Sequence, residues 1–166
     1  MGNYQILKAA YQAYCKGNGQ AFLDAMHDDV VVEYCAPTDI FPFAGPLRGK
    51  PAVIRGVGQI AAEYEWLKFN LNHLLVDGDL GVALTSGRIR HRQSMTEIKV
   101  DMVDVIRMKD GRIIDVKEYF DSLSVAKKAG LRPGAGVQLS GTMSAQTLIT
   151  AADGLAKGPA PRQPSD

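Results

Sequence analysis

Apolar and polar residues alternate through residues 100–120, a pattern that predicts two half-buried β-strands joined by a tight turn. The Lys-Asp-Gly sequence at 109–111 favours a three-residue loop in which glycine takes the left-handed conformation. The register expected from this loop pairs Met108 with Arg112, Ile106 with Ile114, Asp104 with Val116 and Met102 with Glu118. One face of the hairpin is then apolar except for Asp104 and Glu118, on a diagonal with Cβ atoms about 7–8 Å apart. Because ionised groups are costly to bury, this pair indicates a pocket wall rather than a sealed core.

Helical spacing of apolar residues predicts three helices, at residues 4–16, 20–27 and 51–68. Further strands are expected at 30–35, 69–76 and 80–93, which gives an α+β arrangement of helices followed by an antiparallel meander. Between the first strand and the third helix lies a loop rich in proline and glycine. Its apolar residues Ile40, Phe41 and Phe43 are unusual in a solvated loop, so it either packs over a cavity mouth or forms a lid.

Composition narrows the function classes. The chain has 166 residues and a formal net charge of +1, so no basic footprint for nucleic acid is present. Its two cysteines make no disulfide framework, and no Cys/His spacing resembles a zinc site. No signal pattern and no membrane-spanning apolar run is seen, which favours a cytoplasmic protein.

The domain organisation follows from a change in composition near residue 132. We expect one domain over residues 1–131, followed by an extension over 132–166 that is rich in glycine, proline and alanine. Only residues 144–156 of this extension have helical character, and the rest is expected to be partly disordered.

Three motifs carry a resemblance to a known fold family. They are Asp-Asp-Val-Val at 28–31, Gly-Pro-Leu-Arg-Gly-Lys at 45–50, and Val-Asp-Val-Ile-Arg-Met-Lys-Asp-Gly-Arg-Ile at 103–113, followed by Glu-Tyr-Phe-Asp at 118–121. With the order of elements, they resemble the nuclear-transport-factor-2-like superfamily, in particular its SnoaL-like branch, related to ketosteroid isomerases, polyketide cyclases and limonene-epoxide hydrolases. The resemblance covers about residues 6–130. It implies a cone-shaped, curved antiparallel sheet wrapped around three helices, one apolar pocket, and a homodimer through the outer sheet face.

The resemblance also implies roles for individual residues. Asp104 matches the aspartic acid with which ketosteroid isomerases stabilise an oxyanion. Tyr34 stands at their general-base position, and their oxyanion tyrosine falls near Ala10, with Tyr11 and Tyr14 close by. Glu118 matches the proton-transfer carboxylate of both the polyketide cyclases and the epoxide hydrolases. The arginine of the epoxide hydrolases matches Arg88, while Arg90 stands where they have an aspartate.

The catalytic candidates are therefore Glu118, Asp104, Arg88 and Tyr34. Other readings stay open: a buried ion pair of Glu118 with Arg88 or Arg90, a bond from Asp104 to a loop backbone, and a merely packed ring for Tyr34. The substrate-binding candidates, all aromatic or apolar, are Tyr14, Phe41, Phe43, Tyr64, Met102, Ile106, Val116 and Phe120. If the two carboxyl groups share an apolar wall, one should hold its proton, which supplies an acid and a base.

The expected function is proton transfer on an apolar carbonyl or epoxide compound, of isomerase, cyclase or hydrolase type, without cofactor or metal. The expected partners are that small molecule and a second copy of the chain, with no nucleic acid or membrane. The alternative is a non-catalytic domain that binds a small hydrophobic ligand or scaffolds a dimer.

Overall fold

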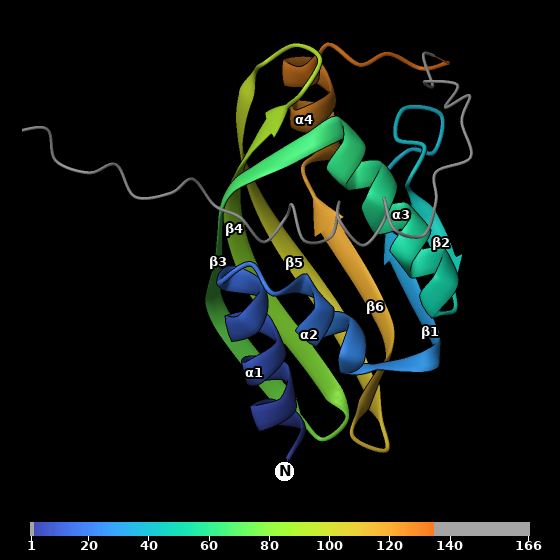
Figure 1. The fold of residues 1–166 in the computed structure, drawn as a ribbon, viewed down its shortest axis with the longest axis vertical. Helices are drawn as coiled ribbons and strands as arrows, with labels where there is room; N and C mark the ends of the chain where they lie inside the picture. The colour runs from blue at the N-terminus through green and yellow to red at the C-terminus, as the bar shows by residue number, and fades with distance from the viewer. Residues whose placement is uncertain (1, 135–166) are drawn as a thin grey trace, which may run out of the picture.

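The computed structural model describes residues 2–134, which form a curved sheet with helices packed on one of its faces (Figure 1). The elements in chain order are α1 (Asn3–Cys15), α2 (Gly19–Asp24), β1 (Met26–Tyr34), β2 (Gly45–Arg48), α3 (Lys50–Glu63), β3 (Tyr64–Asp77), β4 (Leu80–His91), β5 (Glu97–Lys109), β6 (Arg112–Phe120) and α4 (Ser122–Ala129). The predicted α+β class with a curved sheet is confirmed.

The six strands lie in the order β2-β1-β6-β5-β4-β3. The pair β1–β6 is parallel, and the other four pairings are antiparallel. The parallel contact brings the end of β1 beside the end of β6, so Tyr34 is the register partner of Glu118. Two residues far apart in the sequence are thereby neighbours in the sheet.

The last hairpin differs from the predicted register by two residues. Its turn is the two-residue Asp110-Gly111, both with positive φ (50° and 72°), so Lys109 pairs with Arg112. A bulge then leaves Ile114 out of the ladder, between the pairs Met108–Ile113 and Arg107–Asp115. Turn and bulge each shift the register by one residue. Beyond the bulge the register differs from the predicted one by two residues, so each side chain lies on its predicted face. Asp104 and Glu118 therefore still share a face.

Several element boundaries also differ from the sequence-based expectation. The third helix ends at Glu63, because residues 64–68 pair with β4 as part of β3 although their apolar spacing also fits a helix. The second helix ends at Asp24, and β1 begins at Met26. Strand β2 forms within the expected loop, and α4 was not predicted. This last helix begins at a cap where Asp121 accepts a hydrogen bond from the Ser124 amide.

The core lies between the helices and the concave face of the sheet. Its largest fully buried side chains are Tyr11, Phe41, Leu7, Ile98, Ile106, Ile113, Val30 and Val53. Burial alternates along strand β5: from Glu97 to Lys109, every second residue is buried, and those between are exposed or partly buried. The sequence alternation in β5 was therefore a reliable guide to which face is inside.

Within residues 2–134, no helix is both long enough and apolar enough to cross a membrane. The predicted extension lies almost entirely outside the described residues, and so does its predicted helix at 144–156.

Candidate active site

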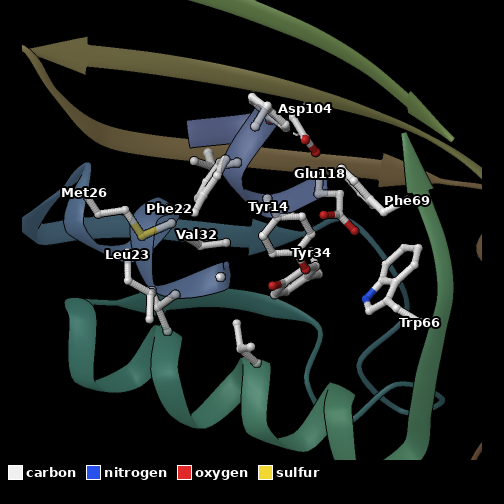
Figure 2. A pocket seen from close by; sticks show the side chains of 15 residues that line it. Tyr14, Phe22, Leu23, Met26, Val32, Tyr34, Trp66, Phe69, Asp104 and Glu118 are labelled. Carbon is white, nitrogen blue, oxygen red and sulfur yellow. Dashed lines mark hydrogen bonds between the residues drawn. The ribbon is translucent and has the colours of Figure 1, made fainter. Parts of the chain in front are cut away.

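Two carboxyl groups on neighbouring strands lie at the centre of the candidate site. Asp104 of β5 is directly opposite Glu118 of β6 rather than on the predicted diagonal. Directly opposite residues of an antiparallel pair have Cβ atoms about 4.5–5.5 Å apart, so the two groups are closer than the sequence suggested. Both point to the side of the sheet covered by the helices (Figure 2).

Helix α1 supplies the partner of Asp104. The Tyr11 hydroxyl donates a hydrogen bond of 2.5 Å to Oδ2 of Asp104. Tyr11 is only 2% exposed and Asp104 only 6%, so this contact is shielded from water. The other oxygen, Oδ1, is buried and accepts no hydrogen bond from any residue in the described part of the chain. Asp104 is thus held by one oxygen, while the other has no hydrogen-bond donor among the described residues.

The surroundings raise the pKa values of both carboxyl groups. Burial raises the pKa of Asp104 to about 6, against the opposing effect of the Tyr11 hydrogen bond. The pKa of Glu118 lies well above its ordinary value, first because of burial and second because of the nearby charge of Asp104. Although Glu118 is only partly buried, the space that it faces has apolar walls, so the ionised form is poorly solvated. Both carboxyl groups therefore keep their protons to higher pH than free side chains do.

The carboxyl groups line a cavity of about 100 Å³ between the sheet and the helices. Most of its fifteen lining residues are apolar or aromatic: Tyr11, Tyr14, Gly19, Phe22, Leu23, Met26, Val32, Tyr34, Val53, Val57, Trp66, Phe69, Asp104, Val116 and Glu118. Burial, followed by the charge of Glu118, raises the pKa of both Tyr14 and Tyr34. These hydroxyls stay protonated and remain available as donors to a ligand.

The predicted substrate-binding residues divide between two cavities. Tyr14 and Val116 line the first cavity. A second cavity, of about 50 Å³, is lined among others by Phe41, Phe43, Tyr64, Met102 and Phe120. The loop aromatics Phe41 and Phe43 thus line this second cavity. Ile106 is fully buried in the core and lines neither cavity.

Arg88 does not face the cavity, and this corrects the sequence-based orientation. The inward residues of β4 have odd numbers, from Gly81 to His91, so Arg88 and Arg90 lie on the opposite face. The Arg88 side chain is 52% exposed and lies 3.6 Å from the Glu97 carboxylate. Neither arginine forms an ion pair with Glu118; Arg90 pairs with Glu65 and Glu97.

The sequence analysis missed one contact of the site and one contributor to it. The apolar spacing of the first helix placed Tyr11 inward, but spacing cannot reveal that its hydroxyl meets Asp104, 93 positions away. Phe69 packs edge-on against Tyr14 at 4.8 Å and against Trp66 at 5.2 Å between ring centroids. A register shift between Trp66 and Lys68 brings both Trp66 and Phe69 to the cavity, so simple alternation along β3 does not reveal Phe69.

In residues 2–134, no group of three or more His, Cys, Asp or Glu side chains is arranged to hold a metal ion. The titratable side chains that line the first cavity are the carboxyl groups of Asp104 and Glu118 and the phenols of Tyr11, Tyr14 and Tyr34.

Comparison with known proteins gives this site a context. A family model described as a SnoaL-like domain matches residues 7–116. No curated protein matches the chain in sequence.

Solved structures share the fold at low sequence identity. A nuclear-transport-factor-2-like protein from Burkholderia thailandensis is 22% identical, with a TM-score of 0.70 over 80% of this chain and 99% of that one. TerC, co-crystallised with polyporic acid, is 16% identical, with a TM-score of 0.68 over 77% of this chain and 98% of that one. A candidate SnoaL-like polyketide cyclase from Mesorhizobium loti is 16% identical, with a TM-score of 0.63 over 72% and 99%. At these identities, the likeness establishes the fold alone.

Proposed function

The chain belongs to the SnoaL-like domain family, and from this premise we propose that it is a small acid–base enzyme that moves a proton on an apolar carbonyl compound. The observation that carries the proposal is the pair Asp104–Glu118, which lie directly opposite in the sheet and both have raised pKa values. We assign the ionised form near neutral pH to Asp104, which accepts the Tyr11 hydrogen bond, and the protonated form to Glu118. A carboxylic acid and a carboxylate in one apolar cavity provide the two groups that general acid–base catalysis requires.

The proposed step is enolisation of the bound ketone. Glu118 donates its proton to the carbonyl oxygen, while Oδ1 of Asp104 accepts a proton from the adjacent carbon, so a C–H bond breaks and an O–H bond forms. The product is the enol, with Asp104 protonated and Glu118 ionised. Return of the proton to the same carbon reverses the step, and return to another carbon of the conjugated system isomerises the compound.

Each carboxyl group suits its role because of its contacts. Tyr11 stabilises the ionised form of Asp104 by a hydrogen bond to Oδ2, which leaves Oδ1 for the substrate. Glu118 lies in the cavity wall beside the rings of Tyr34 and Trp66 (Figure 2), where apolar contacts favour its neutral, proton-donating form. The Tyr14 and Tyr34 rings bring further hydroxyl donors to the same cavity.

The substrate class follows from the cavity walls. A mostly apolar wall with a few polar groups favours a ring compound whose polar function is the reacting carbonyl. Two relatives of the same fold support this class: TerC was co-crystallised with polyporic acid, and another is a candidate polyketide cyclase. An epoxide is a second possible electrophile, because Glu118 as an acid can protonate its oxygen.

Hydrogen exchange in heavy water tests the proposal without knowledge of the natural substrate. With 1-tetralone as probe, the protein should accelerate loss of the hydrogen signal next to the carbonyl. Glu118→Gln and Asp104→Asn should each lower that acceleration by about 100-fold or more. Tyr4→Phe, on the exposed surface, is the control that should keep it. If 1-tetralone binds but the wild-type rate equals that of buffer, the domain is a non-catalytic binder of apolar ligands, which is the alternative function.

We also propose that the chain forms a homodimer through the outer face of the sheet. Val82 pairs with Val105 and Leu84 with Val103 on that face, and all four side chains are only partly buried. Tyr119, 46% exposed, is the register partner of Val103 and extends the patch. Light scattering should give twice the chain mass, and Val103→Asp should give a monomer. A monomeric wild-type chain would contradict this proposal.

A further inference from the structure

The second cavity shares part of its wall with the first. Tyr34, Trp66 and Glu118 line both cavities, so the carboxyl group that acts as the acid stands at their junction. On the far side of this junction the walls are almost entirely apolar, with aromatic rings from the loop before β2 and from β6. A ligand whose carbonyl lies at Glu118 is therefore adjacent to both cavities.

The residues at the junction are held in place by their neighbours. The Trp66 indole packs against β4 at Gly87, where an added Cβ would lie 2.3 Å from the indole Cζ3. The Tyr34 ring packs edge-on against Phe43, with 5.6 Å between centroids. Contacts outside the first cavity thus fix both rings, so the position of the junction is determined by the packing of the fold.

One fully buried polar atom in the second cavity's wall, the Tyr64 hydroxyl oxygen, has no partner among the described residues. Tyr64 is 3% exposed, and its buried hydroxyl forms no hydrogen bond within the described part of the chain. Burial raises its pKa, so the hydroxyl stays protonated and is a donor. Buried hydroxyls are normally hydrogen-bonded, because desolvation without a partner is unfavourable. The orphaned donor suggests a ligand oxygen as its partner.

We infer that the two cavities form one binding site for a two-ring apolar ketone that carries a second oxygen acceptor on its distal ring. One ring occupies the first cavity, the carbonyl lies at Glu118, and the distal ring occupies the second cavity, where its oxygen accepts a hydrogen bond from Tyr64. This inference rests on the proposed function for the position of the carbonyl. It adds a substrate class and a specificity-determining residue outside the acid–base pair.

Trp66 makes the inference measurable, because it is the only tryptophan of the chain and lines both cavities. Its fluorescence should change on titration with 4-methoxybenzophenone and with 4-ethylbenzophenone, a pair that differs by an ether oxygen in place of a methylene. Wild-type protein should bind the methoxy compound about five- to tenfold more tightly, the effect of one buried hydrogen bond. Tyr64→Phe keeps the ring and should abolish this preference, whereas Tyr4→Phe should retain it.

A second variant protects the test against a folding defect in Tyr64→Phe. Ile60 lines the second cavity but not the first, so Ile60→Phe should weaken binding of both benzophenones and leave cyclohexanone binding unchanged. Equal affinities of the two benzophenones for wild-type protein, or no saturable signal with either, would overturn the inference.

The inference and the proposed function can fail separately. Glu118→Gln should lose hydrogen exchange but keep the preference for the methoxy compound, because that preference depends on Tyr64. If the preference is present and exchange is absent in wild-type protein, the binding site stands without the catalytic proposal. If exchange is present and the preference is absent, the catalytic proposal stands without the second cavity.

Discussion

Asp104 and Glu118 are register partners in the β5–β6 ladder, and they occupy the same apolar face of the sheet. Two carboxyl groups at this separation in a poorly solvated cavity do not ionise together, because the second charge is opposed by the first. Since Tyr11 donates a hydrogen bond that stabilises the ionised form of Asp104, we propose that the first ionisation falls on Asp104 and that the proton stays on Glu118.

The first prediction concerns the pH dependence of proton transfer. The active form has Asp104 ionised and Glu118 protonated, so kcat/KM should rise through a pKa of about 6 and fall again at higher pH as Glu118 ionises. The two limits belong to the coupled pair rather than to either residue alone. Asp104→Asn should remove the acidic limb from any residual activity, and Glu118→Gln the alkaline limb. A flat profile in wild-type protein between about pH 5 and 9 would contradict the assignment.

The Tyr11 hydroxyl provides the second prediction. Its hydrogen bond lowers the pKa of Asp104 against the effect of burial, so Tyr11→Phe should move the acidic limb of kcat/KM to higher pH. A role limited to packing would lower stability without moving this limb. Tyr4→Phe removes a hydroxyl from an exposed tyrosine on the same helix, and its profile should match the wild type.

Much of this site was predictable from sequence, because β-strand alternation survives a shift of register by two residues. It placed Asp104 and Glu118 on one apolar face even though the turn and the Ile114 bulge were not foreseen. A shift by one residue would have moved one carboxyl group to the other face. Asp104 and Glu118 were therefore placed on the same face correctly only because the turn and the bulge each shift the register by one residue in the same direction.

The errors have equally local causes. Arg88 was oriented by its match to a family position, whereas the parity of β4 directs Thr85, Ile89 and His91 inward. The helix predicted to reach residue 68 had suitable spacing, but pairing with β4 outweighs local preference there. The Tyr11–Asp104 contact joins helix to sheet, and no single-sequence pattern encodes such a distance.

The third prediction concerns stability. The pKa of Asp104 is higher in the folded state, at about 6, than the value of 3.8 for a free side chain. Its stabilising contribution is thus present below about pH 4 and is lost as pH rises through about 6. A difference of roughly two pKa units corresponds to about 3 kcal/mol. Asp104→Asn, neutral throughout, should gain up to this free energy of unfolding relative to wild type between about pH 4 and 7.

Urea denaturation at several pH values measures this difference. Asp110→Asn removes a carboxyl group from the exposed turn and serves as the matched control. An Asp104→Asn variant whose stability relative to wild type falls as pH rises would contradict the burial argument.

The fourth prediction concerns Arg88. Because its side chain lies on the outer face with Glu97, Arg88→Gln should leave kcat/KM for hydrogen exchange within about twofold of wild type. The exposed ion pair should also add little to stability, on the order of 0–1 kcal/mol. A loss of rate by tenfold or more, measured with 1-tetralone, would mean that Arg88 takes part in catalysis and would contradict the orientation found for β4.

Titration of the Asp104 and Glu118 carboxyl carbons by NMR tests the central claim most directly. The account predicts that Asp104 titrates near pH 6 and Glu118 at higher pH, and that Asp104→Asn lowers the Glu118 pKa because it removes the neighbouring charge. If both groups titrate near their ordinary values of about 4, they are solvated and independent, and the acid–base pair does not exist.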